Sequence, residues 1–224
     1  MPFSDMEGVQ PGSTVVSEGK PLQIRTGFDL MGRILNSLGE PIDDLGPIWG
    51  DGFTTLKSSP PHPMKRHRIK ERFRTGIKVL DTFVPCGVGQ RLGIFAGSGV
   101  GKSTLLGMIA GHAEADVNVI ALIGERGREL REFVERDLSP EARKKSVVIV
   151  ATSDETPIMR LKGAYTAMAI SEYFRDQGSK VLLMMDSVTR FAMAQREVGL
   201  SAGELPATKG YPPSVFAQIP QLVE

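Results

Sequence analysis

The stretch that decides the fold reads Ala96-Gly97-Ser98-Gly99-Val100-Gly101-Lys102-Ser103. An apolar, strand-like run at residues 92–95 precedes it, and the helix-forming residues 104–110 follow it. A strand, a glycine-rich loop that ends in Gly-Lys-Ser, and a helix are together typical of the loop that binds nucleotide phosphates. The consensus begins with Gly, and Ala96 replaces it where the residue ends a strand. The sequence therefore predicts that the chain binds a nucleoside triphosphate.

The residue types of this loop suit that chemistry. Small side chains let successive backbone N–H groups curl around a polyphosphate, and the N-terminus of the following helix adds a positive dipole end. Lys102 can reach the β- and γ-phosphates, and the Ser103 hydroxyl can ligate Mg²⁺.

Composition is that of a globular protein, with 41% hydrophobic and 24% charged residues. The length of 224 residues allows one ordinary domain and part of another. A net charge of +1 gives no overall attraction to nucleic acids or acidic membranes. The single cysteine, Cys86, excludes an intramolecular disulfide. No run has the length of a membrane span and the N-terminus lacks a signal-peptide pattern, so we expect a cytoplasmic protein.

The first part of the chain has a different pattern from the rest. Residues 1–58 are rich in Gly, Pro and turn pairs between short alternating segments, which predicts a small β-structure. Consecutive prolines then indicate a linker over residues 59–75. The basic run at residues 65–72 is interpreted as a solvated linker face rather than a nucleic-acid patch, because no aromatic residues interleave it.

The later part alternates strands and helices, which predicts a parallel sheet covered on both faces with ligands at the carboxyl ends of its strands. Thr156 can cap the last helix and Pro157 suits its first turn. Its apolar stripe is interpreted as core packing. The expected strands are residues 91–95, 117–123, 146–151 and 181–185, the expected helices are residues 102–113, 127–137 and 157–176, and the stripe is Ile158, Leu161, Tyr165 and Met168.

Two carboxylates follow buried strands. Asp186 ends the run at 181–185, where it can hold Mg²⁺ beside the phosphate loop. Glu125 follows the run at 117–123, and two readings stay open from spacing alone. It either polarises a water in line with the γ-phosphate or favours a helix N-terminus through the dipole. Gly124 allows a close backbone approach there.

Two arginines follow Glu125. Either can contact phosphate or pair with a glutamate of the same helix, Glu129 or Glu132. We expect Arg126 near the nucleotide and Arg128 in an ion pair.

The chain closely resembles the hexameric rotary-ATPase superfamily. Within that superfamily it most resembles the flagellum-specific ATPases of the type III export apparatus. The similarity runs from about residue 20 to the last residue. The stretches that carry it are residues 30–43, 75–81, 89–104, 124–133, 186–190 and 210–216. One departure is Glu71-Arg72-Phe73-Arg74, where relatives usually have a Pro-Leu pair.

The resemblance implies a RecA-like nucleotide-binding core at residues 76–224, preceded by part of a small N-terminal β-barrel at residues 1–58. Glu125 matches the catalytic carboxylate, which is Gln in non-catalytic paralogues, and Asp186 matches the magnesium carboxylate. Arg126 matches a residue near the γ-phosphate. The implied nucleotide-binding residues are Gly97, Ser98, Gly99, Val100, Gly101, Lys102, Ser103 and Thr104.

The implied activity is Mg²⁺-dependent ATP hydrolysis that drives protein export. The implied partners are five further copies in a homohexamer, components and substrates of the export apparatus, and the inner membrane through those partners. No nucleic acid is expected. Relatives also have a complete barrel, a C-terminal helical domain and a trans-acting arginine finger, so we expect the chain to be a fragment.

Three alternatives stay open. The chain is a virulence-type secretion ATPase, a nucleotide-binding fragment with little catalysis, or a nucleic-acid motor of the transcription-terminator type. The third has only the basic run at residues 65–72 in its support.

Overall fold

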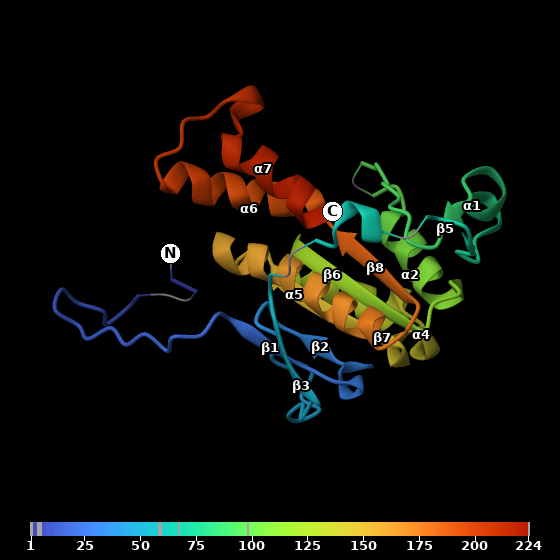
Figure 1. Cartoon of the computed structure of the whole chain (residues 1–224), viewed down its shortest axis with the longest axis horizontal. Coiled ribbons are helices and arrows are strands. Elements are labelled where there is room, and N and C mark those ends of the chain that lie inside the picture. Colours follow the sequence, from blue (N-terminus) through green and yellow to red (C-terminus); the bar gives the residue numbers. More distant parts are fainter. Residues whose placement is uncertain (1, 4–5, 58–59, 67, 98, 224) are drawn as a thin grey trace.

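The computed structural model of the chain describes residues 2–3, 6–57, 60–66, 68–97 and 99–223. At its centre lies a four-stranded sheet of order β2-β7-β6-β8, in which all neighbours are parallel (Figure 1). The strands are β2 (Ile34–Leu35), β6 (Val117–Glu125), β7 (Ser146–Thr152) and β8 (Val181–Asp186). The predicted α/β fold with a parallel sheet is confirmed.

Helices cover both faces of this sheet and create two cores. On one face, α5 (Pro157–Asp176) and α6 (Val188–Ser201) pack over Val119 and Ile123 of β6. On the other face, residues of α2 (Lys102–His112) and α4 (Pro140–Lys144) cluster with Ile120. Alternate side chains of a strand point to opposite faces, so a strand buried on both faces reads as one continuous apolar run. This is why the sequence pattern located β6 and β7.

Helix α5 has the predicted bounds, 157–176, with Pro157 in its first turn. Of its predicted stripe, Leu161 is buried, and Tyr165 and Met168 pack against the same core, which confirms the core interpretation for these three residues. Ile158, the fourth residue, is not part of that core and lines a cavity instead. The predicted cap is wrong. The Thr156 side chain accepts no hydrogen bond from the first turn of the helix, and its Oγ1 donates to the carbonyl oxygen of Phe3 at 3.3 Å.

The predicted helix at residues 127–137 is divided into two elements. Helix α3 (Gly127–Glu132) has no buried residue, and a π-helix (Phe133–Asp137) follows it. A π-turn has one residue more than an α-turn. The wider turn accompanies the burial of Phe133 and Val134 in the core next to α2. The other helical elements are α1 (Lys78–Phe83), α7 (Pro213–Val223) and 3₁₀ turns at Phe28–Leu30, Pro63–Lys65 and Thr208–Gly210.

The predicted strand at residues 91–95 is wrong. This segment has no regular structure, and the side chain of Phe95 is 97% exposed. A buried parallel strand needs a neighbour and cover on both faces. Here the segment pairs with no described strand, Ile94 packs only partly against the core next to α2, and Gly93 offers no side chain to pack. The apolar pattern alone did not distinguish a docked strand from an undocked one.

The N-terminal part packs on the central sheet. An antiparallel pair, β1 (Gln23–Thr26) and β3 (Gly52–Thr55), is the kind of structure that the expected partial barrel contributes. Strand β2 instead pairs with β7, with Ile34 opposite Val148. Leucines and isoleucines of this part enter the core beneath α5; they are Ile24, Leu30, Leu35, Ile48 and Leu56. The domain boundaries at residues 58 and 75 stay predictions.

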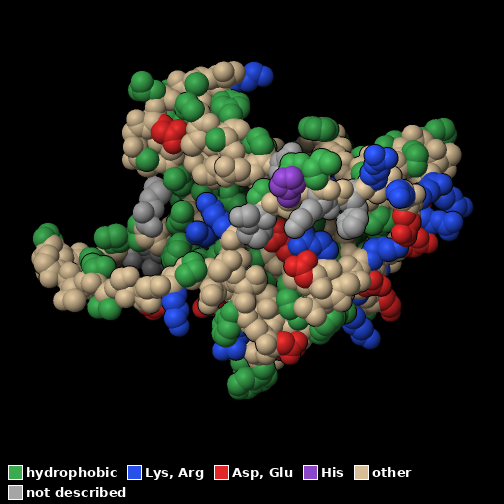
Figure 2. Space-filling view, viewed as in Figure 1, with side chains coloured by type: hydrophobic (Ala, Val, Ile, Leu, Met, Phe, Trp, Pro, Cys, Tyr) green, Lys and Arg blue, Asp and Glu red, His purple; other side chains and the backbone are tan. Residues whose placement is uncertain are grey.

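The expected linker includes a short strand. There, β4 (Arg72–Phe73) pairs antiparallel with β5 (Cys86–Gly87), and Arg72 Nη2 donates to the Asp81 carbonyl oxygen of α1. Basic side chains gather over the end of the molecule where α1 and β5 lie (Figure 2). Arg68 and Lys70 of the basic run are exposed there, as expected of a solvated face. Among the described residues, no helix is long and apolar enough to cross a membrane.

Candidate nucleotide-binding and catalytic site

Lys102 and Asp186 meet at the carboxyl end of the sheet, although 84 positions separate them in the sequence. Lys102 is the first residue of α2, and Asp186 is the last residue of β8. Their Nζ and Oδ1 atoms form an ion pair, in which the Asp186 side chain is 7% exposed and that of Lys102 is 29% exposed. The sequence predicted both residues for one site, and the fold brings them together.

The loop before α2 is open and has the backbone geometry that requires glycine. Gly99 has φ 75° and Gly101 has φ 91°, both in the left-handed region. A Cβ atom added at either position meets nothing within 4 Å, so backbone conformation and not space selects glycine. Gly97 and Val100 are exposed, whereas Ser98 lies outside the described residues. Exposed N–H groups in such a loop are available to an anionic ligand.

Ser103 and Thr104 lie in the first turn of α2, and both are exposed. The N-terminal N–H groups of a helix have no intrahelical acceptor, and the helix dipole favours negative charge there. The Ser103 hydroxyl is next in sequence to Lys102 and is therefore placed at the same helix end as the Lys102–Asp186 pair.

Glu125 is the last residue of β6, and a local irregularity precedes it. The register of β6 on β7 shifts between Ile123 and Glu125, and Gly124 has φ 71°. A Cβ atom on Gly124 would lie 2.9 Å from Cβ of Arg190 in α6. The close neighbour that the structure shows at Gly124 is thus a side chain of α6, and the backbone approach expected there in the nucleotide crevice stays a prediction. Bulges of this kind redirect the side chain that follows them.

The environment of Glu125 raises its pKa to about 7. Burial is the largest cause, a hydrogen bond with Glu129 is the second, and the negative charge of Asp186 is the third; the positive charge of Lys102 acts in the opposite direction. A carboxyl group with a pKa near neutrality can both accept and release a proton at physiological pH. Sequence reasoning treated Glu129 only as an ion-pair partner. Its position in the first turn of the helix that directly follows Glu125 was the available signal.

The two arginines after Glu125 differ from their predicted arrangement. Arg126 Nη1 lies 3.8 Å from Glu129 Oε1, and the Arg126 side chain is 81% exposed. Glu132 pairs with Arg136 at 4.0 Å. In the described part of the chain Arg128 forms no ion pair, so the predicted pairing is wrong, because Arg126 and Arg136 occupy both glutamates. The catalytic role of Arg126 stays a prediction.

The oxygen donors at this site fit Mg²⁺ bound together with a nucleotide. Asp186 supplies a buried carboxylate and Ser103 a hydroxyl at the adjacent helix end. In the described ranges no group of three or more His, Cys, Asp or Glu could hold a metal. Mg²⁺ usually binds one or two protein ligands, substrate phosphates and water, so it does not need such a group.

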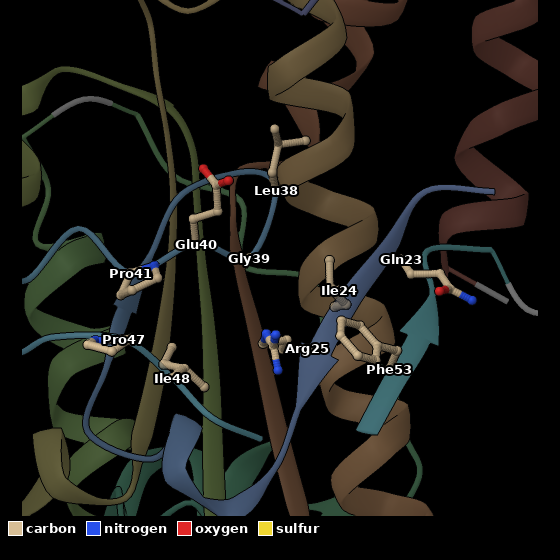
Figure 3. A pocket seen from close by; sticks show the side chains of 10 residues that line it. All are labelled: Gln23, Ile24, Arg25, Leu38, Gly39, Glu40, Pro41, Pro47, Ile48 and Phe53. Carbon is tan, nitrogen blue, oxygen red and sulfur yellow. The ribbon is translucent and has the colours of Figure 1, made fainter. Parts of the chain in front are cut away.

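A cavity of about 330 Å³ lies in the N-terminal part of the molecule and contains none of the predicted site residues (Figure 3). Arg25 lines it, donates from Nη1 to the Trp49 carbonyl oxygen at 2.9 Å, and lies 4.8 Å from the ring centre of Phe53. These contacts give Arg25 a structural role.

Comparisons with known proteins agree with this geometry. The nucleotide-binding domain of the ATP synthase alpha/beta family matches residues 76–224. The flagellum-specific ATP synthase of Bacillus subtilis is 56% identical over 226 residues, which cover 100% of this chain and 51% of that protein. The type 3 secretion system ATPase of Xanthomonas euvesicatoria is 52% identical, with 100% of this chain and 50% of that protein covered.

A solved structure is also similar to this chain. It shows the assembled ATPase EscN in complex with its central stalk EscO, from the type III secretion system of enteropathogenic E. coli. The TM-score is 0.94 at 47% identity, covering 99% of this chain and 55% of that one. The chain spans about half the length of the curated relatives it matches. Because the matched domain spans more than half of its residues, the chain belongs to the ATP synthase alpha/beta family.

Proposed function

We propose that the chain binds ATP with Mg²⁺ and supplies the hydrolytic site of an ATPase that drives protein export through the flagellar type III apparatus. The observation that carries this proposal is the convergence of three side chains from three elements. Lys102 of α2 contacts Asp186 of β8, and Glu125 at the end of β6 interacts electrostatically with both. A cation for phosphate, a carboxylate for a metal and a proton acceptor are the groups that phosphoryl transfer to water requires.

Each side chain has a distinct task in the proposed reaction. Lys102 binds the β- and γ-phosphates, which take the place of Asp186 as its partner. Mg²⁺, when bound, neutralises charge that develops on the phosphate oxygens, and Asp186 and Ser103 are the residues that would hold it. Glu125 orients the attacking water and accepts its proton, for which the carboxyl group must be ionised. With a pKa of about 7, Glu125 is ionised in roughly half of the molecules at neutral pH.

The assembly that we propose around this site is based on a similar solved structure. EscN was solved as an assembled ATPase with a central stalk. The similarity covers 99% of the present chain and 55% of the EscN chain. We infer that the protein forms a homohexamer in the cytoplasm, contacts a central stalk, and reaches the inner membrane through other export components. The flagellar assignment rests on relatives named flagellum-specific ATP synthase at 56%, 55% and 54% identity, against 52% for a virulence-type secretion ATPase.

Two substitutions test the nucleotide site. Lys102→Ala removes the phosphate contact and should abolish binding of a fluorescent ATP analogue. Asp186→Asn should retain nucleotide affinity without Mg²⁺ and lose the gain in affinity that Mg²⁺ produces in the wild type. Thr208→Ala, distant in sequence and exposed, is the matched control. Nucleotide binding that is unchanged in Lys102→Ala would refute the assignment.

A separate measurement tests the alternative of a nucleic-acid motor. Added RNA should leave the ATPase rate unchanged.

One observation favours a second candidate, a nucleotide-binding chain with slow turnover when isolated. Residues 91–97 form no strand, and the side chain of Phe95 next to the phosphate loop is almost fully exposed. A phosphate loop without its supporting strand is less preorganised for the transition state. Turnover of the purified 224-residue chain at increasing concentration separates the two: a rate per chain that rises steeply favours the assembling enzyme, and a low constant rate favours the second candidate.

A further inference from the structure

A second cavity, of about 140 Å³, lies on the opposite face of the sheet from α2. Side chains of α5, α6 and α7 line it, together with Lys57, which follows β3. Ile158, Leu161 and Val198 give it apolar walls. No carboxylate is among its lining residues, whereas two of them are lysines, Lys57 and Lys162. The cavity is therefore a concave, partly apolar site with an excess of positive charge.

Both ammonium groups lack a negative partner among the described residues. In the part of the chain that the structure describes, neither Lys57 nor Lys162 forms an ion pair. Lys57 Nζ lies 5.6 Å from the ring centre of Tyr165, which holds the charge over the cavity wall through a cation–π contact. Lys162 is half-buried, and its pKa is lowered first by burial and then by the positive charge of Lys57. An anion between the two lysines would relieve the burial cost and the repulsion together.

Neutral polar groups complete the lining. Gln195 is 3% exposed, and its Nε2 donates to Ser214 Oγ at 3.1 Å, while its Oε1 has no hydrogen-bond partner. A reversed Gln195 amide would accept from the Ser214 hydroxyl and present its NH₂ group where Oε1 lies. Tyr165 Oη lies 3.4 Å from Gln218 Oε1. With the Gln195 amide in that reversed orientation, the site offers an amide donor and two ammonium donors, which suits an oxyanion.

We propose that this cavity binds a small oxyanion, a phosphate or a carboxylate, between Lys57 and Lys162. The site is separate from the nucleotide site because α5 and α6 lie on the other face of the sheet from α2. The volume of about 140 Å³ restricts the occupant to a small anion or to the terminal group of a larger molecule. This inference is independent of the proposed ATPase activity and stands or falls by its own test.

The test measures anion binding in a Lys102→Ala background, so that the phosphate loop does not contribute. Inorganic phosphate and acetate are titrated separately by calorimetry, which distinguishes the two anion classes. In this background, the double substitution Lys57→Met and Lys162→Met should weaken anion binding at least about tenfold. Lys144→Met, an exposed lysine of α4 on the other face, is the matched control and should leave the affinity unchanged. Absence of binding for both anions, or equal affinity in the double variant, overturns the proposal.

A second measurement uses the unsubstituted chain and does not depend on the folding of a variant. Lysine acetylation at neutral pH is followed by peptide mass spectrometry with and without the anion that binds. The anion should protect Lys57 and Lys162 at least about threefold and leave Lys144 unprotected. If the acetylation of Lys57 and Lys162 is the same with and without the anion, the proposal is overturned.

Discussion

The raised pKa of Glu125 makes a quantitative prediction about stability. Its pKa is about 7 in the folded chain against the ordinary value of 4.5, so the folded state binds the proton more tightly than the unfolded state does. The corresponding stability is fully present below about pH 4.5 and is lost as the pH rises through about 7. The difference of about 2.5 in pKa corresponds to at most about 3 kcal/mol, and solvent screening at this half-buried position reduces it to about 1–2 kcal/mol.

Glu125→Gln removes the titration and keeps the shape of the side chain. Relative to the wild type, the variant should gain about 1–2 kcal/mol in free energy of unfolding between pH 5 and pH 8. Urea unfolding followed by circular dichroism at both pH values measures this difference. Glu18→Gln, at an exposed position outside the helices and strands, is the control and should show no such gain. A difference between Glu125→Gln and wild type that is the same at pH 5 and pH 8 would refute the electrostatic argument.

Three further substitutions test the packing of the fold by urea unfolding. Gly124→Ala should cost about 1–3 kcal/mol, because φ is 71° and the new methyl group meets Arg190, and no cost would contradict the tight contact. Phe174→Ala, fully buried beneath the sheet, should cost about 3–5 kcal/mol, and a loss under 1 kcal/mol would show that the core is looser than described. Asp43→Asn should cost about 3 kcal/mol at neutral pH, because it breaks a buried two-point ion pair with Arg33. Since the pKa of Asp43 is lowered from 3.8 to about 2 by that pair, this cost should diminish as the pH falls through that range; a cost that stays constant would disprove the link.

The sequence predicted the buried sheet strands well, because their physical signal is local. Strands β6 and β7 are apolar at nearly every position, as burial on both faces demands. Helix α5 was also predicted with its correct bounds, from Pro157 and its apolar spacing. Helix α6 was not predicted, although a signal was present: the Ser187 side chain accepts from the Arg190 N–H at its start.

The errors concern contacts that no local pattern encodes. The run at residues 91–95 has the composition of a buried strand, but docking depends on a partner elsewhere in the chain. The hydroxyl of Thr156 donates to a backbone carbonyl 153 positions away, a contact that no local pattern predicts. For the site, the positions after two strand ends brought Glu125 and Asp186 to one edge, and the glycine-rich loop before a helix located Lys102 beside Asp186. The ion pairs of the exposed arginines were not predictable, because several glutamates compete within one helical turn at similar free energy.

The Lys102–Asp186 ion pair has a consequence for ligand binding. Because Lys102 neutralises a carboxylate with little solvent exposure, removal of Lys102 alone leaves an unpaired buried charge. Nucleotide phosphates must therefore compete with Asp186 for Lys102, and a metal ion must compete with Lys102 for Asp186. Binding of either ligand alone breaks the Lys102–Asp186 ion pair and leaves one of the two charges unpaired, whereas both ligands together pair both charges. ATP and Mg²⁺ should therefore bind more tightly together than either does alone.

The most direct test of the central claim separates nucleotide binding from hydrolysis at Glu125. In the full-length protein, Glu125→Gln should keep the affinity for Mg²⁺ and ATP within about threefold of the wild type. Steady-state ATP turnover should fall at least about 100-fold, because the variant has no group to accept the proton of the attacking water. Turnover within about tenfold of the wild type, with nucleotide binding intact, would contradict the assignment of Glu125 as the catalytic carboxylate.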